Sequence, residues 1–133
     1  MKLVDASVAM KWLVDEDGSE AAAELANTVP LVAPELLRAE VGNALVTKLR
    51  RGDINGEEVM SAFNAVGYFV ARWIAMPTLA DRALAIACNL RHPIYDCYYL
   101  AAAESEVLEL VTADQRLIAA VRDTEHARWV VPL

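Results

Sequence analysis

Four acidic residues stand where a carboxylate could do chemistry: Asp5, Glu40, Asp96 and Asp114. Asp5 directly follows one short apolar segment and Asp114 follows another, so both would leave the carboxyl ends of predicted strands. In an open parallel sheet these ends share one edge, and ligands bind outside it. Glu40 and Asp96 lie among apolar residues of predicted helices, where a carboxylate must be paired, protonated or bound to a cation. The four acids are therefore candidates for one shared site.

Each acid also has a purely structural interpretation. Asp96 and Asp114 stand at the starts of predicted helices, where a carboxylate can cap the helix or be stabilised by its N-terminus. Glu40 could pair with Arg38 or Asn43, and the acid after the first strand could accept hydrogen bonds from the turn that follows. Any one acid is a weak signal, so the prediction of a site depends on all four.

A shared acidic site needs a compensating cation. Two carboxylates about 4 Å apart repel by about 4 kcal/mol at an effective dielectric constant near 20. Few lysines or arginines lie nearby in the sequence, so Mg²⁺ or Mn²⁺ is the counterion that fits an all-carboxylate site. We expect Asp5 and Asp96 to bind the metal directly, with Glu40 and Asp114 completing its shell through water or positioning the nucleophile. An ion held in this way can supply what phosphodiester hydrolysis needs, because it can activate water and stabilise charge on the phosphate.

Short strands alternate with helices along the chain, which predicts crossover connections and a parallel sheet. The fold class expected is α/β, a three-layer α/β/α sandwich with a short, mostly parallel central sheet, in a single domain over residues 1–133. Ser7 is expected to cap the first helix, and Asn55 with Glu58 forms a capping box for the fourth. The strands are predicted at Lys2–Val4, Leu31–Ala33, Trp73–Met76, Glu109–Thr112 and Trp129–Val131, and the helices at 8–14, 20–27, 34–50, 56–70, 78–89, 95–106 and 114–122.

Composition restricts the class of protein. The 133 residues are 56% hydrophobic and 23% charged, enough for a real core and inconsistent with disorder. The longest uncharged stretch, Val59–Ala71, is too short to cross a bilayer, and the start of the chain lacks the unbroken apolar run of a signal peptide, so we expect a cytoplasmic protein without a membrane partner. Two isolated cysteines and two isolated histidines lack the spacing of a zinc site. The net charge of −7 argues against binding nucleic acid through bulk charge, but not against binding it through a metal.

Four blocks of sequence, taken together, resemble the PIN-domain nucleases, and most closely their VapC-type toxins. The resemblance covers essentially the whole chain and implies a PIN-like fold. It also implies that the four acids form a metal site, with Ser7 and Thr112 as supporting hydroxyls at its edge. Because Gln115 follows the last acid, no fifth ligand is expected. The blocks are Leu3–Val8, Pro34–Leu45, Tyr95–Ala101 and Val111–Asp114.

The same resemblance implies an activity and partners. VapC-type toxins are Mg²⁺- or Mn²⁺-dependent ribonucleases that cut single-stranded or loop RNA, and most are homodimers. Each pairs with a VapB-like antitoxin that blocks the site, and DNA is bound only indirectly, through that antitoxin. The expected function is therefore a metal-dependent endoribonuclease acting as the toxin of such a pair. The alternative is a catalytically silent PIN-fold module that acts only through its partner protein.

Substrate contacts would come from the few cations near the acids. Lys11 and Arg116 are the residues we expect to bind RNA, whereas the Arg50-Arg51 pair is better explained as the positive end of a helix. The aromatic residues at helical spacing are expected to pack in the core or a dimer rather than to stack on bases. They are Trp12, Tyr68, Phe69 and Trp73.

Overall fold

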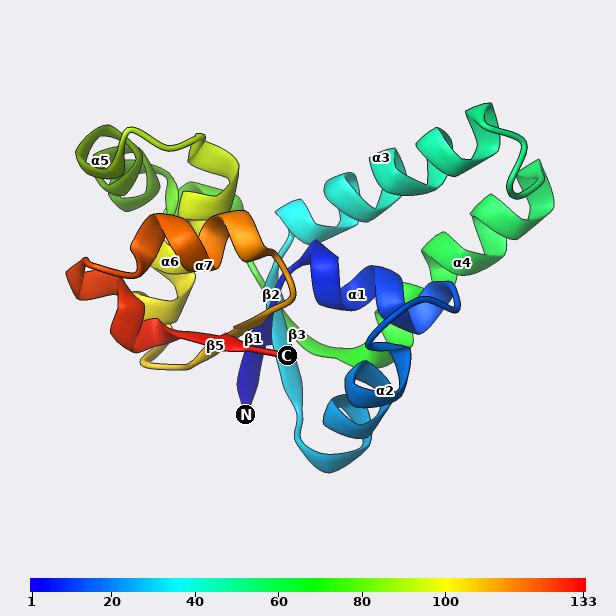
Figure 1. The fold of residues 1–133 in the computed structure, drawn as a ribbon, viewed down its shortest axis with the longest axis horizontal. Helices are drawn as coiled ribbons and strands as arrows, with labels where there is room; N and C mark the ends of the chain where they lie inside the picture. Colours follow the sequence, from blue (N-terminus) through cyan, green and yellow to red (C-terminus); the bar gives the residue numbers. More distant parts are fainter.

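The computed structural model describes residues 1–133 and has a five-stranded sheet in the order β3-β2-β1-β4-β5 (Figure 1). Every pair of neighbouring strands is parallel, so the carboxyl ends of all strands lie along one edge. The strand that carries the first acid, β1, is the central one. The strands are β1 Lys2–Val4, β2 Leu31–Pro34, β3 Val70–Ile74, β4 Leu110–Thr112 and β5 Val130–Pro132.

Helices cover both faces of the sheet, and this confirms the expected three-layer sandwich. Helices α1–α4 gather on one side, and α5–α7 on the other (Figure 1). None of the helices is both long enough and apolar enough to span a lipid bilayer. The helices are α1 Ala6–Leu13, α2 Ser19–Thr28, α3 Leu36–Arg50, α4 Gly56–Phe69, α5 Ala80–Leu90, α6 Ile94–Glu106 and α7 Gln115–Val121, with 3₁₀ turns at Met76–Thr78 and Glu125–Trp129.

The core forms where these layers meet. Strands β2 and β4 are buried along their whole length, because a parallel sheet covered on both faces has no solvent side. Helix α6 packs against β1 and β2, and it buries the run Leu100–Ala103, whose three alanines allow a close approach to the sheet. The same helix carries Asp96 in its first turn, so burial of its middle fixes that acid at the carboxyl edge of the sheet.

Helices α3 and α4 form a hairpin that projects from the body of the molecule (Figure 1). The predicted capping box at the start of α4 is confirmed: Glu58 N donates to Asn55 Oδ1 at 2.9 Å, and Asn55 N donates to Glu58 Oε1 at 3.2 Å. The junction after α4 differs from the prediction. Strand β3 begins at Val70, three residues before the expected start at Trp73, because Val70 continues the helical spacing of α4 but pairs with Leu31 of β2.

Two further local predictions are corrected. The N-cap of α1 is Asp5 and not Ser7, which lies within the first turn of the helix. Pro34 ends strand β2 instead of opening α3, which begins at Leu36. A proline at the end of a strand removes no hydrogen bond from the middle of the sheet, and a proline is also favoured in the first turn of a helix. The sequence around Pro34 therefore could not tell a strand end from a helix start.

Candidate active site

Asp5 lies at the junction of β1 and α1, and its side chain is only 6% exposed. Its Oδ1 accepts hydrogen bonds from the Ser7 and Val8 backbone N–H groups at 3.0 and 3.3 Å, and from Ser7 Oγ at 2.5 Å. Its Oδ2 accepts a hydrogen bond from the hydroxyl of Thr112. Both oxygens of this carboxylate are therefore held by the protein, which fixes its position between two strands.

The hydroxyls of Ser7 and Thr112 join the ends of β1 and β4. They lie 3.3 Å apart, and Ser7 Oγ accepts the Ala113 N–H at 2.8 Å while Thr112 Oγ1 accepts the Asp114 N–H at 3.0 Å. Through them the structure brings Asp114 beside Asp5, as the strand ends predict. Asp114 also caps α7, because its Oδ1 accepts from two backbone N–H groups at the start of that helix, at 2.8 and 3.4 Å.

Glu40 and Asp96 line one groove between α3 and α6, with a volume of about 410 Å³. Tyr99 Oη donates to Glu40 Oε1 at 2.7 Å, and neither Arg38 nor Asn43 pairs with this acid. His92 Nε2 contacts Asp96 Oδ2 at 2.6 Å. The groove is lined by Leu36, Ala39, Glu40, Asn43, Pro93, Tyr95 and Asp96.

Asp96 is not a helix cap. The N-cap of α6 is Pro93, and no backbone N–H of that helix donates to the Asp96 carboxylate. For this residue the capping interpretation is wrong, although Asp96 does lie in the first turn of α6, where the helix N-terminus favours negative charge; Asp5 and Asp114 do cap their helices. Asp5 and Asp114 can each cap a helix and belong to a metal site, because a carboxylate has two oxygens and several lone pairs.

Burial and neighbouring carboxylates raise the pKa of Asp5 and of Glu40. Burial is the main reason that the pKa of Asp5 is raised; hydrogen bonds from Ser7, Thr112 and the Val8 N–H oppose it, and the charge of Asp114 adds to it. Burial also raises the pKa of Glu40; the hydrogen bond from Tyr99 lowers it, and the charges of the other three acids raise it further. The charges of all three other candidate acids therefore act on the pKa of Glu40, so the four acids lie near enough to interact electrostatically.

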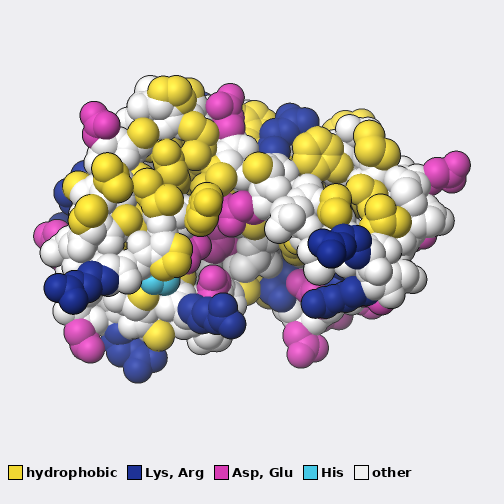
Figure 2. All heavy atoms as spheres, turned by 90° about the horizontal axis from the view of Figure 1, so that it is seen from above, with side chains coloured by type: hydrophobic (Ala, Val, Ile, Leu, Met, Phe, Trp, Pro, Cys, Tyr) yellow, Lys and Arg dark blue, Asp and Glu magenta, His cyan; other side chains and the backbone are white.

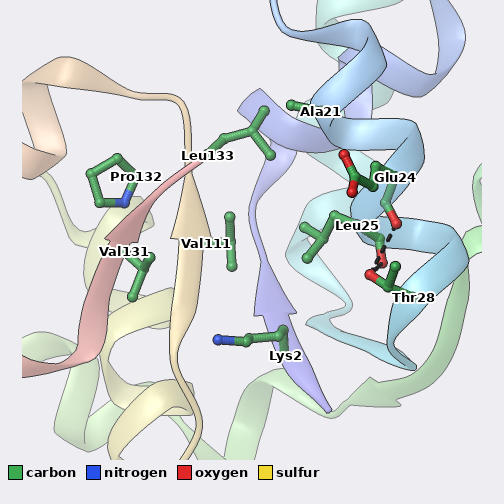
Figure 3. A pocket seen from close by; sticks show the side chains of 9 residues that line it. All are labelled: Lys2, Ala21, Glu24, Leu25, Thr28, Val111, Val131, Pro132 and Leu133. Atoms are coloured by element: carbon green, nitrogen blue, oxygen red, sulfur yellow. Dashed lines mark hydrogen bonds between the residues drawn. The ribbon is translucent and has the colours of Figure 1, made fainter.

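Figure 2 looks down on the carboxyl edge of the sheet and shows acidic side chains between two lobes of the surface. A separate hollow of about 300 Å³ lies between α2 and the C-terminal strand, and Glu24 is its single acid (Figure 3). It contains none of the four candidate acids. The groove with Glu40 and Asp96 is thus the hollow where acidic chemistry is concentrated.

The four acids offer oxygen ligands only, which suit Mg²⁺ or Mn²⁺. No group of three His, Cys, Asp or Glu side chains lies close enough together to hold one ion, so the site is not a closed cage. Mg²⁺ commonly keeps several waters and binds through one or two carboxylates. Glu40 Oε2, Asp96 Oδ1 and Asp114 Oδ2 have no protein donor, while the other oxygen of each side chain does. The residues therefore fit a hydrated divalent ion.

Two residues in contact with the acids were missed by the sequence analysis. Tyr99 follows Asp96 by three residues, a spacing that places both on one side of α6, whereas His92 lies before the helix, four residues ahead of Asp96. His92 has no second histidine near it in the sequence, so no metal-site spacing marks it. Tyr99 reaches an acid 59 positions away, which no local pattern indicates.

The two predicted RNA contacts differ in their surroundings. Arg116 is exposed in the first turn of α7, two residues after Asp114. The Lys11 ammonium donates to Glu16 Oε1 at 3.3 Å and to the Asp17 carbonyl at 2.5 Å, in the turn between α1 and α2. RNA would have to replace these bonds at Lys11 but not at Arg116.

The aromatic residues pack as expected, with one exception. The rings of Trp12 and Phe69 stack with centroids 4.8 Å apart, and the Arg38 guanidinium lies over the Trp73 ring at 5.6 Å. Tyr68 is 90% exposed in this chain, so no core contact explains it.

Replacing Glu40 with glutamine gives a pH-dependent gain in stability in the absence of metal. Because the folded-state pKa of Glu40 is above its ordinary value of 4.5, the folded chain binds more protons there than the unfolded chain, and stability falls as pH rises through that window. Glutamine imitates the protonated acid and keeps the acceptor for Tyr99. Thermal melts in EDTA should show a higher Tm than wild type at pH 8, by about 3–5 °C, and no difference near pH 4.5.

The exposed acid Glu24 on α2 provides the matched control, since Glu24→Gln should follow wild type at both pH values. With saturating Mn²⁺ the order should reverse, because the ion stabilises the charged carboxylate of the wild type. A Glu40→Gln advantage that is the same at both pH values would contradict the electrostatic explanation.

Comparison with known proteins identifies the family. The PIN domain model matches residues 2–123. Ribonuclease VapC1 of Mycobacterium tuberculosis is 36% identical over 91 residues, which are 66% of this chain and 65% of the relative, so the chain spans slightly less than two thirds of that protein. The crystal structure of PAE2754 from Pyrobaculum aerophilum is 27% identical, with a TM-score of 0.73 over 97% of this chain and 81% of that one. A toxin–antitoxin complex from Klebsiella pneumoniae includes a chain with the same fold, 17% identical with a TM-score of 0.71 over 98% of this chain and 96% of that one. The chain described here belongs to the PIN domain family.

Proposed function

We propose that this chain is an endoribonuclease that hydrolyses RNA phosphodiester bonds with Mg²⁺ or Mn²⁺ at Asp5, Glu40, Asp96 and Asp114, and that it is a VapC-type toxin. The observation that carries the proposal is that Glu40 and Asp96 line one open groove and that the charges of Asp5, Asp96 and Asp114 all act on Glu40. Three of them keep one carboxylate oxygen without a protein donor. Membership of the PIN domain family and the similarity to a relative named Ribonuclease VapC1 support the same activity.

The chain's own groups divide the work. Asp5 and Asp96 are the proposed direct ligands; the hydroxyls of Ser7 and Thr112 hold Asp5 in place, and its Oδ2, which accepts one hydrogen bond, keeps a lone pair for the ion. A bound divalent ion supplies an activated water and stabilises charge on the phosphate. Glu40 and Asp114 complete the site, and their unbonded oxygens can accept hydrogen bonds from the attacking water. Four carboxylates without a cation would repel the phosphate of RNA, so the metal is required for binding as well as for chemistry.

Arg116 and Lys11 are the proposed contacts to the RNA backbone. Arg116 is exposed two residues after Asp114, and its guanidinium has no carboxylate partner, so it is free to bind phosphate. Lys11 lies farther along α1 and would first have to leave Glu16. A chain with net charge −7 has few other cations for this purpose, so binding should depend mainly on the metal and on the shape of the groove.

The proposal includes the partners of such a toxin. We expect a VapB-like antitoxin that covers the acidic groove, a homodimer of this chain, and contact with DNA only through the antitoxin. The structural relative found in a toxin–antitoxin complex has the same fold and supports this part of the proposal. A cytoplasmic location follows from the proposed substrate and partner.

The test is cleavage of single-stranded RNA by the purified chain. We expect cleavage with Mn²⁺ or Mg²⁺, a fall of at least about 100-fold in EDTA, and recovery when the ion is restored. Cleavage that is unchanged in EDTA would contradict the metal site. A folded chain that cuts no RNA with either ion but binds an antitoxin would establish the silent binding module instead.

A further inference from the structure

Two residues donate hydrogen bonds to the acids of the groove: His92, just before α6, and Tyr99, within that helix. Helix α5 ends at Leu90; its C-cap Arg91 has a left-handed backbone with φ of 51°, and the chain then passes through His92 and Pro93 into α6. The His92 backbone N–H donates to the Ala87 carbonyl at 3.2 Å, which ties this residue to the end of α5. His92 thus stands on a fixed backbone directly before the helix that carries Asp96.

The imidazole of His92 holds one oxygen of Asp96. Its Nε2 lies 2.6 Å from Asp96 Oδ2, and because an ionised carboxylate only accepts hydrogen bonds, Nε2 donates. The side chain of His92 is 16% exposed, and no other protein group donates to Asp96. The N-cap Pro93 has no N–H, so Asp96, as the third helical residue, cannot form the capping-box bond back to the N-cap. His92 alone therefore determines how this carboxylate is turned.

The phenol of Tyr99 does the same for Glu40. Tyr99 is 1% exposed and lies one turn after Asp96 on α6, where its hydroxyl donates to Glu40 Oε1 across the groove wall at 2.7 Å. A buried hydroxyl needs a partner, and Glu40 is the one it has. The contact joins α6 to α3 and fixes the second carboxylate of the groove.

We propose that His92 and Tyr99 are positioning residues of the acidic site, each holding one oxygen of a groove carboxylate so that the other oxygen stays open to a divalent cation. The inference rests on the proposed function, because it needs the metal. Groups that hydrogen-bond a metal ligand set its orientation, and their loss commonly lowers metal affinity about 10–100-fold. Neither residue touches the RNA or the ion in this proposal.

A purely structural role predicts something different. A partly exposed pair such as His92 and Asp96 contributes little to stability, and its loss would not change how tightly the folded chain binds metal. The two roles are therefore separated by the affinity of the folded chain for Mn²⁺, measured together with its Tm in EDTA.

The experiment is calorimetric titration of Mn²⁺ alone into the full chain. We expect His92→Ala and Tyr99→Phe each to weaken Mn²⁺ binding by at least about tenfold. His92→Gln, which places an amide N–H near the position of Nε2, should recover affinity to within about threefold of wild type.

Two matched controls share the same helices. Arg82→Gln breaks the pair of Arg82 with Glu104, which joins α5 to α6 away from the acids, and Tyr98→Phe removes a neighbouring hydroxyl that makes no hydrogen bond with the protein. Both controls should bind Mn²⁺ within about twofold of wild type. Melting in EDTA verifies that each variant is folded at the temperature of the titration.

The outcomes are distinct. Wild-type affinity in both His92→Ala and Tyr99→Phe would overturn the inference while leaving the proposed function intact. An equal loss in the Arg82→Gln control would also overturn it, because a general loosening of α6 would then be the cause. A wild-type chain that binds no Mn²⁺ would overturn the proposed function, and this inference with it.

Discussion

Asp96→Asn should lower the rate of RNA cleavage at least about 100-fold and leave the metal-free fold as stable as wild type. The expected loss follows from the role of a direct ligand, since even groups behind the ligands change metal affinity about 10–100-fold. Stability should be kept because this side chain caps no helix and its partner His92 can still donate to the amide oxygen. The measurements are initial rates of cleavage at saturating Mn²⁺ and the Tm in EDTA.

The control is another aspartate in the first turn of a helix. Asp81 stands at the start of α5 as Asp96 does at the start of α6, but it is exposed and makes no hydrogen bond with a neighbouring side chain. Asp81→Asn should keep full activity, which separates loss of the ligand from a general change in charge. Full activity in Asp96→Asn would contradict its assignment to the metal site.

Much of the fold could be predicted from local patterns. The first and fourth strands lie within one residue of the bounds predicted from the apolar segments. The capping box of α4 was predicted from Asn55 and Glu58. Asp5 directly follows the first strand and Asp114 the fourth strand. Because the carboxyl ends of parallel strands share one edge of the sheet, the sequence predicts that these two acids lie close together. These features depend on neighbours in the chain, and the sequence displays them directly.

Other features depend on contacts that no local pattern contains. The start of β3 at Val70 is set by pairing with β2, so a residue that continues the helical spacing of α4 becomes the first of a strand. The bond of Tyr99 to Glu40 requires the packing of α6 against α3, and its 59-residue separation is invisible to periodicity. The orientation of the acids is thus the part of the site that the sequence could not predict.

The capping roles of Asp5 and Asp114 explain how a stable chain tolerates an acidic cluster. Burial, with a smaller contribution from the charge of Asp114, raises the pKa of Asp5, which costs folding free energy when this acid is charged. Hydrogen bonds from the start of α1 and from Thr112 offset part of that cost in the absence of metal. The same side chain therefore has a structural role and a proposed chemical role, and substitutions at this position can separate them.

Asp5→Asn and Asp5→Ala should both lower cleavage at least about 100-fold, but Asp5→Ala alone should lose the hydrogen bonds that hold β1 to α1 and β4. Both variants remove the buried charge, so their difference in stability measures the hydrogen bonds. Asparagine is a good N-cap, keeps an acceptor for the Ser7 and Val8 N–H groups and can donate from its amide to the Thr112 hydroxyl, whereas alanine does none of these. We expect Asp5→Ala to be about 2 kcal/mol less stable than Asp5→Asn in urea unfolding without metal.

Asn55→Ala gives the matched control, because it removes the N-cap of α4 far from the acids. This substitution should lower the free energy of unfolding by about 1 kcal/mol, the usual effect of losing one helix cap, and leave cleavage unchanged. Equal stability of the two Asp5 variants would show that the bonds to Ser7 and Thr112 add nothing to the fold. Full activity of Asp5→Asn would instead show that Asp5 is not a metal ligand, and the contacts of Asp5 with α1 and β4 would then serve only to stabilise the fold.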